Sequence, residues 1–198
     1  MSATARPYGL RPISDFSGTV RPLVMKNGIA SGLAANLFKY QAVMLDATNG
    51  TITPVTATTD KIYGVFMGVE YTPTGQRPVV ADFWPSGSTY VAGLDKMEVC
   101  ICPAWVDNMR FQIQADGSVP QSAYGAQFNL SNFAAGSTFT GLSAMTAAAT
   151  PIAAASQGQL QLIEFGEDID NNVGDAFTDL IVAISYPQAV SGFQTSPG

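Results

Sequence analysis

Short runs of alternating apolar and polar residues, separated by turn-forming residues, fill most of this chain. The clearest run is "YQAVMLDATNGTITPV" at residues 40–55. It predicts two strands joined at Asn49-Gly50, because Asn and Gly readily adopt the positive φ values of a tight hairpin turn. Residues 62–71 also alternate, and one of their two faces is wholly aromatic or apolar. Both segments therefore predict strands with at least one buried face.

Further strands follow along the chain. "KMEVCICPAW", at 96–105, predicts a buried strand, and "MRFQIQAD", at 109–116, alternates cleanly up to an Asp-Gly turn. "LQLIEFGED", from residue 160, and "DLIVAISYPQ", from residue 179, predict a closing strand pair. Gly and Pro are scattered throughout, which suits many turns between short strands. The pattern predicts an all-β fold, with a β-sandwich, jelly-roll or barrel-like body.

Two segments depart from this pattern. Residues 1–25 hold three prolines and show no periodicity, which predicts an extended N-terminal arm that lies on a neighbouring surface; a frayed terminus is the alternative. The body then covers residues 26–190, and residues 191–198 form a flexible tail. Residues 131–158 are small, polar and low in charge, and Pro151 interrupts any helix there. They predict a surface excursion with short strands.

Charge is unevenly distributed. Through Lys39 the chain has five basic residues and one acid, a net charge of +4, and the remainder has four bases and fourteen acids, a net charge of −10. A basic arm on an acidic body indicates electrostatic docking on a partner. Nucleic acid is disfavoured as that partner because no dense Lys/Arg patch with interleaved aromatic residues is present. No apolar run approaches a membrane span, and no secretory signal is recognised, so we expect synthesis in a cytoplasm.

The sequence offers no positive argument for an enzyme or a cofactor. Histidine is absent, which removes the commonest general base and the commonest ligand for zinc or copper. Cys100 and Cys102 are two residues apart, a spacing that suits a disulfide poorly, and no further ligands lie near them. We interpret both as buried apolar residues.

Two stretches are weak candidates for ligand binding. Asp168, Asp170 and Asn172 have the first, third and fifth spacing of a calcium loop, but the sixth position lacks its glycine and the twelfth lacks its glutamate. A solvated acidic hairpin loop is the better interpretation. "DFWPSGSTY", at 82–90, has the aromatic and polar composition of a sugar-binding edge, with Trp84 as the candidate stacking residue.

Five segments together support a resemblance: "RPYGLRPI", "KYQAVMLDATNGTITPVTA", "IYGVFMGVEYT", "DFWPSGSTYVAG" and "RFQIQADGSV". In this order they resemble structural proteins of tailed bacteriophages that look like capsid decoration, or cement, proteins. The resemblance spans about residues 5 to 187 and contains no catalytic signature. It implies a β-rich, non-enzymatic virion protein that is made in the host cytoplasm. Such a protein coats the outside of the shell, binds the major capsid protein and strengthens the DNA-filled head.

The resemblance and the charge pattern lead to a specific expectation. We expect a homo-oligomer, with a trimer favoured over a dimer, that contacts the shell through the N-terminal arm. The candidate gripping residues are Arg6, Pro7, Tyr8, Leu10, Arg11, Ile13, Phe16 and Arg21. The residues near 134–157 suit an exposed or oligomer-facing loop. Two alternatives are another virion part, such as a tail, head-tail or fibre-base protein, and a carbohydrate-binding β-sandwich that uses Trp84.

Overall fold

The structure is a computed structural model, and it describes residues 4–15, 17–94, 96–105, 109–153, 156–167 and 171–188. The described chain is almost entirely β-strand and turn, which confirms the predicted all-β class. One short 3₁₀ helix, η1 (Gln121–Ala123), interrupts the strands. The strands form two larger antiparallel sheets and two small strand pairs.

The first large sheet, called here the upper sheet, has five strands in the order β1-β10-β15-β14-β11. These are β1 (Arg11–Ser14), β10 (Arg110–Gln114), β15 (Asp179–Ile184), β14 (Leu160–Phe165) and β11 (Gln127–Phe128). The predicted strand pair near the end of the chain forms as expected, since Leu162 of β14 lies opposite Val182 of β15. A small pair, β12 (Leu130–Ser131) and β13 (Thr146–Ala147), lies beside this sheet.

The second large sheet, called the lower sheet, has the order β2-β9-β6-β4-β5, with β7 beside β6. Its strands are β2 (Leu23–Lys26), β9 (Met97–Pro103), β6 (Gly64–Tyr71), β4 (Ala42–Asp46), β5 (Thr51–Pro54) and β7 (Val79–Ala81). The predicted hairpin at 40–55 is confirmed, because β4 and β5 pair across a turn that includes Gly50 at φ +67°. β3 (Leu37–Phe38) pairs separately with β8 (Phe83–Trp84).

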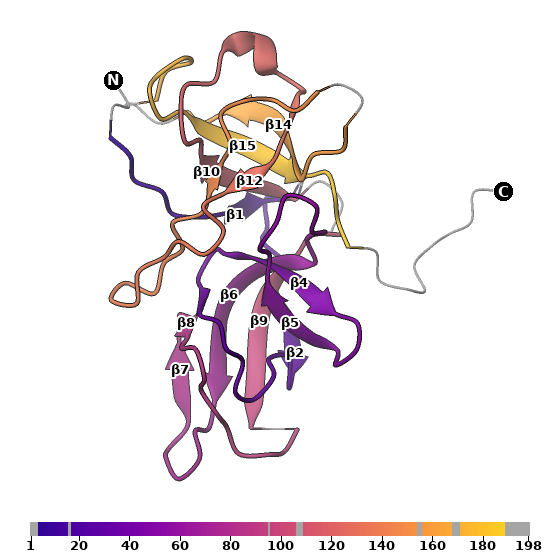
Figure 1. The fold of residues 1–198 in the computed structure, drawn as a ribbon, viewed down its shortest axis with the longest axis vertical. Helices are drawn as coiled ribbons and strands as arrows, with labels where there is room; N and C mark the ends of the chain where they lie inside the picture. The colour runs from indigo at the N-terminus through magenta and orange to yellow at the C-terminus, as the bar shows by residue number, and fades with distance from the viewer. Residues whose placement is uncertain are drawn as a thin grey trace, which may run out of the picture.

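The two sheets stack end to end along the long axis of the molecule, with the upper sheet above the lower (Figure 1). Two buried clusters fill the body. The lower core holds Phe66, Trp84 and Val99, among others. The upper core is built around Phe111, Ile113 and Phe128, but it also includes Val65 and Cys102 of the lower sheet. Side chains of both sheets therefore meet in the upper core, while the lower core is a separate cluster.

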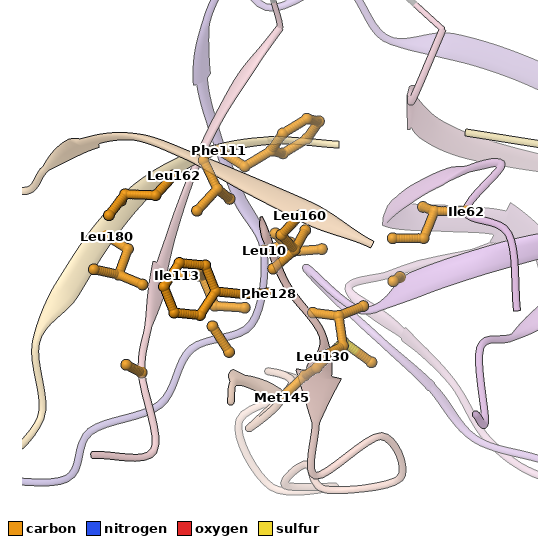
Figure 2. Packing of buried hydrophobic residues seen from close by; sticks show 14 of the residues in the cluster. Leu10, Ile62, Phe111, Ile113, Phe128, Leu130, Met145, Leu160, Leu162 and Leu180 are labelled. Atoms are coloured by element: carbon orange, nitrogen blue, oxygen red, sulfur yellow. The ribbon is translucent and has the colours of Figure 1, made fainter. Parts of the chain in front are cut away.

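The N-terminal segment is extended, as predicted, but it packs on its own chain. Leu10 is fully buried in the upper core, near Leu160 and Phe128 (Figure 2). β1 then forms one edge of the upper sheet, a turn reverses the chain, and β2 forms one edge of the lower sheet. This segment, from Leu10 through β2 and called here the strap, therefore joins the two sheets, and the neighbouring surface on which it lies is that of its own body. A contact of its exposed side chains with a partner stays a prediction.

The prolines of this segment explain why a strap and a free arm look alike in sequence. Pro12 lies within β1 and Pro22 directly precedes β2, and both strands are sheet edges. Proline is tolerated at an edge because its missing N–H leaves no interior ladder bond unmade. Just before β1 the chain passes close to Tyr40, and Gly9 makes this approach possible. Its φ is +78°, and a Cβ there would lie 2.4 Å from the carbonyl oxygen of Tyr40.

Residues 131–158 are only partly the surface excursion that the sequence predicted. Met145, Thr146 and Ala147 are buried, and Ala147 pairs with Leu130 in the β12–β13 ladder. Small residues here let the segment pass close to neighbouring elements, as at Gly136, where a Cβ would collide with the ring of Phe38 in β3. The predicted short strands are present, but the surface assignment is wrong for residues 145–147.

Candidate interaction surface

The predicted gripping residues divide into three groups by their placement. Arg6, Arg11, Ile13 and Arg21 are exposed. Pro7 and Tyr8 are half-buried, and the Tyr8 hydroxyl donates a hydrogen bond to Oδ1 of Asp179 at 3.1 Å. Leu10 is fully buried and serves the core, so it is not available to a partner. Phe16 lies outside the described residues.

The β1 edge presents Arg11 and Ile13 to solvent. These residues are two apart on a strand and therefore lie on the same face. Pro12 has no N–H to donate, and the pairing of β1 with β10 shifts register between Pro12 and Ser14. Proline and register irregularities are the usual means by which a sheet edge resists addition of a further strand. A partner of this edge would therefore contact side chains rather than extend the sheet.

Asp15 organises the reversal between β1 and β2. Its Oδ1 accepts hydrogen bonds from the backbone and the hydroxyl of Ser17, at 2.7 Å and 2.6 Å, and from the backbone N–H of Thr19 at 3.2 Å. These hydrogen bonds, with the Ser17 hydroxyl first, lower the pKa of Asp15 below its ordinary value. Arg21 lies 3.3 Å from the other carboxylate oxygen and remains largely exposed. The turn thus fixes Arg21 on the outer side of the strap.

β2 continues the same mixture of basic and apolar exposed residues. Leu23 and Val24 are exposed, and Lys26 lies 3.6 Å from Glu98. Val24 borders a shallow groove of about 290 Å³ on the outer face of the lower sheet, where Met67 and Cys100 form part of the floor. Three carboxylates also line this groove, those of Glu70, Asp82 and Glu98.

Both cysteines are free thiols. Cys102 is buried, as predicted, and burial together with the neighbouring Cys100 raises its pKa to about 12. Cys100 is only half-buried, so the prediction is wrong for this residue; burial still raises its pKa above the ordinary value. Because the thiolate is the reactive form of cysteine, these shifts disfavour nucleophilic or metal-binding behaviour at neutral pH.

Trp84 does not form a sugar-binding edge. It is fully buried in the lower core, with its ring centroid 4.8 Å from that of Tyr71 and 6.2 Å from that of Tyr90. Phe83, its neighbour on β8, stacks on Phe38 with a centroid separation of 6.2 Å. The sequence identified the aromatic residues, but alternation alone did not reveal that both sides of β8 are covered.

The acidic segment after β14 is described only in part. Asp168 and Asp170 of the candidate calcium loop lie outside the described residues. The backbone N–H of Asn172 donates to Oδ2 of Asp175 at 3.0 Å, a local hydrogen bond of the kind that closes a turn. Within the described part of the chain, no three His, Cys, Asp or Glu residues gather in a metal-binding arrangement.

The loop near residues 134–157, predicted to be exposed or oligomer-facing, carries an exposed aromatic side chain at Phe139 that was not singled out from the sequence. This residue lies in the segment between β12 and β13 and is 97% exposed. Figure 1 shows this segment reaching out from the side of the molecule near the level where the two sheets meet. No local pattern marks this residue, because the uncharged stretch from Gly117 to Ile163 also contains fully buried side chains such as Phe128 and Met145.

Comparisons with protein-family models, characterised proteins and solved structures find no match to this chain. In the residues that the structure describes, no helix is both long enough and apolar enough to span a membrane.

Proposed function

We propose that this chain is a non-enzymatic virion structural protein, specifically a decoration protein that binds the outer surface of a bacteriophage capsid as a homo-oligomer. The proposal rests on the resemblance described above and on one structural observation. The N-terminal segment holds the body together with Leu10 and the strands β1 and β2, while it presents Arg11, Ile13, Arg21 and Val24 to solvent.

This arrangement suits attachment to a large rigid surface. The strap is already ordered by its pairing with β10 and β9. Binding of a partner to its exposed side chains would therefore cost little conformational entropy of the backbone. Two arginines of the N-terminal segment, Arg6 and Arg11, are exposed on a protein of net charge −6, and an acidic partner surface would favour docking at these cations. The remaining acidic surface then faces solvent and opposes uncontrolled association.

The test is binding to undecorated shells of the phage that encodes the protein. Arg11→Glu places a negative charge on the β1 edge, and Arg77→Glu is the matched control because Arg77 is an exposed arginine in the β6–β7 connection. We expect wild-type and Arg77→Glu proteins to co-sediment with shells equally. Arg11→Glu should weaken binding by roughly tenfold or more, and increasingly at low salt.

Equal binding by all three proteins would show that the strap is not the contact. Absence of binding by the wild-type protein to shells at any salt concentration would overturn the decoration function. Immunogold labelling of intact virions would then distinguish a position on the head from one on the tail or at the fibre base.

A further inference from the structure

The sequence holds two Asn-Gly pairs, Asn27-Gly28 and Asn49-Gly50, and this dipeptide is the one most prone to spontaneous deamidation. The backbone nitrogen of the glycine attacks the side-chain carbonyl carbon of the asparagine, and glycine has no Cβ to obstruct the approach. A new carbon–nitrogen bond forms, the bond to the side-chain nitrogen breaks, and ammonia leaves a five-membered succinimide. Water opens this ring to aspartate or isoaspartate, so the net change is gain of water and loss of ammonia.

The structure shields the first of these pairs. Gly28 is buried, and a Cβ added to it would lie 2.3 Å from Cγ1 of Val99, so the space beside its backbone is filled. Its carbonyl accepts a hydrogen bond from the N–H of Ile52 at 2.7 Å, and the N–H of Asn27 donates to the carbonyl of Met97 at 2.9 Å. Ring closure needs a base at the glycine nitrogen and rotation of the chain, and close packing opposes both here.

The second pair is accessible to solvent. Asn49 and Gly50 are both exposed in the turn between β4 and β5. Hydroxide, buffer bases and water therefore reach the nitrogen of Gly50 and the side chain of Asn49. Exposure selects this pair as the one that reacts in the folded protein.

Asp46, the last residue of β4, holds both of the groups that must react. Its Oδ2 accepts a hydrogen bond from Nδ2 of Asn49 at 2.6 Å, and its backbone carbonyl accepts one from the N–H of Gly50 at 2.8 Å. Nδ2 is the leaving group of the reaction, and the nitrogen of Gly50 is the nucleophile. Both hydrogen bonds oppose the attack, because the glycine nitrogen must lose its proton and the side-chain amide must turn toward it.

The charge of Asp46 strengthens this hold. Its Oδ1 accepts a hydrogen bond from the N–H of Thr48 at 2.9 Å, and this bond, followed by that from the Asn49 side chain, lowers the pKa of Asp46. The carboxylate is therefore ionised in the neutral and alkaline range, where deamidation of this kind proceeds. A hydrogen bond to a charged acceptor is stronger than one to a neutral acceptor. The negative charge also disfavours the amide anion that Gly50 becomes when it loses its proton.

We infer that Asn49-Gly50 is the deamidation site of this protein and that the Asp46 side chain slows the reaction there. Conversion of Asn49 to aspartate replaces the N–H donor with a second carboxylate, so the 2.6 Å contact with Asp46 changes from attractive to repulsive. Isoaspartate also adds a methylene group to the backbone of the turn. Either product loosens the β4–β5 hairpin, and Asp46 therefore prolongs its chemical lifetime. This inference goes beyond the proposed function and does not depend on what the protein binds.

Two serine substitutions test the role of the carboxylate. Asp46→Ser removes the charged acceptor of Asn49 but leaves the backbone carbonyl that binds Gly50. Asp60→Ser is the matched control, because Oδ2 of Asp60 also accepts backbone hydrogen bonds at a turn, from Thr56 and Ala57, both at 2.9 Å. No Asn-Gly pair lies in that turn.

The folded proteins are incubated in mildly alkaline buffer, and peptide mapping by mass spectrometry follows the conversion of each asparagine. In the wild type we expect Asn49 to react faster than Asn27, but more slowly than Asn49 in protein unfolded by urea. Asp46→Ser should raise the rate at Asn49 roughly tenfold, since one charge-assisted hydrogen bond no longer has to be broken. Asp60→Ser should leave that rate unchanged.

The rate at Asn27 in each sample separates a local effect from general unfolding. Loss of the Asp46 side chain accelerates Asn49 alone, whereas unfolding of the body would also make Asn27 reactive. If Asp46→Ser fails to fold, the comparison of folded and urea-unfolded wild-type protein decides. Equal rates at Asn49 in those two states would overturn the inference, as would an unchanged rate at Asn49 in folded Asp46→Ser or faster reaction at Asn27 than at Asn49 in the wild type.

Discussion

At the scale of single residues, Gly9 is the position where sequence and fold are most tightly linked. Its positive φ is unfavourable for any residue with a side chain, and an added Cβ would overlap the Tyr40 carbonyl. We expect Gly9→Ala to lower the free energy of unfolding by about 2–4 kcal/mol, from backbone strain and overpacking together. Gly18→Ala is the control, because Gly18 has a similar φ of +81° but open space around it, and should cost about 1 kcal/mol. If urea denaturation showed equal decreases in the free energy of unfolding for the two variants, the close approach of Gly9 to Tyr40 would be contradicted.

At the scale of elements, the strands that the sequence predicted best are those whose alternation is set by burial on one face. β10 was predicted from the alternation of Phe111 and Ile113 with Gln112 and Gln114. The structure buries the two apolar residues as expected, but it also buries Gln114. β1 and β2 were missed because each has only four residues and one contains proline, so neither shows a readable period. Their place at sheet edges depends on pairing with β10 and β9, which are far away in sequence. Local pattern carries no signal for such long-range pairing.

The same limit applied to the candidate site. The sequence showed that the N-terminal segment is basic and partly apolar, and Arg11, Ile13 and Arg21 are indeed exposed. It did not show that Leu10 faces inward, because a single leucine between glycine and arginine fits either a core or an interface. Likewise, Trp84 and Phe139 are both aromatic, yet one is fully buried and the other almost fully exposed. Only the three-dimensional neighbours of a side chain decide between these outcomes.

The strap leads to a prediction that differs from that for a detachable arm. Removal of residues 1–22 deletes β1, the Asp15 turn and the buried side chain of Leu10, so we expect the melting temperature to fall by roughly 10 °C or more. Leu10→Ala alone should account for about 2–4 kcal/mol, whereas Arg11→Ala should change stability by less than about 0.5 kcal/mol. Differential scanning calorimetry measures all three proteins. An unchanged melting temperature after truncation would show that the body folds without its strap.

At the scale of the whole molecule, the shared upper core predicts cooperative unfolding of both halves. Val65 and Cys102 of the lower sheet pack in the same cluster as Phe111 of the upper sheet, and the strap pairs with both sheets. We therefore expect one calorimetric transition with equal calorimetric and van't Hoff enthalpies. Val99→Ala in the lower core and Leu180→Ala in the upper core should each shift that single transition downward. If each substitution instead moved only one of two separate transitions, the halves would be independent units. The strap would then join the two halves without coupling their stabilities.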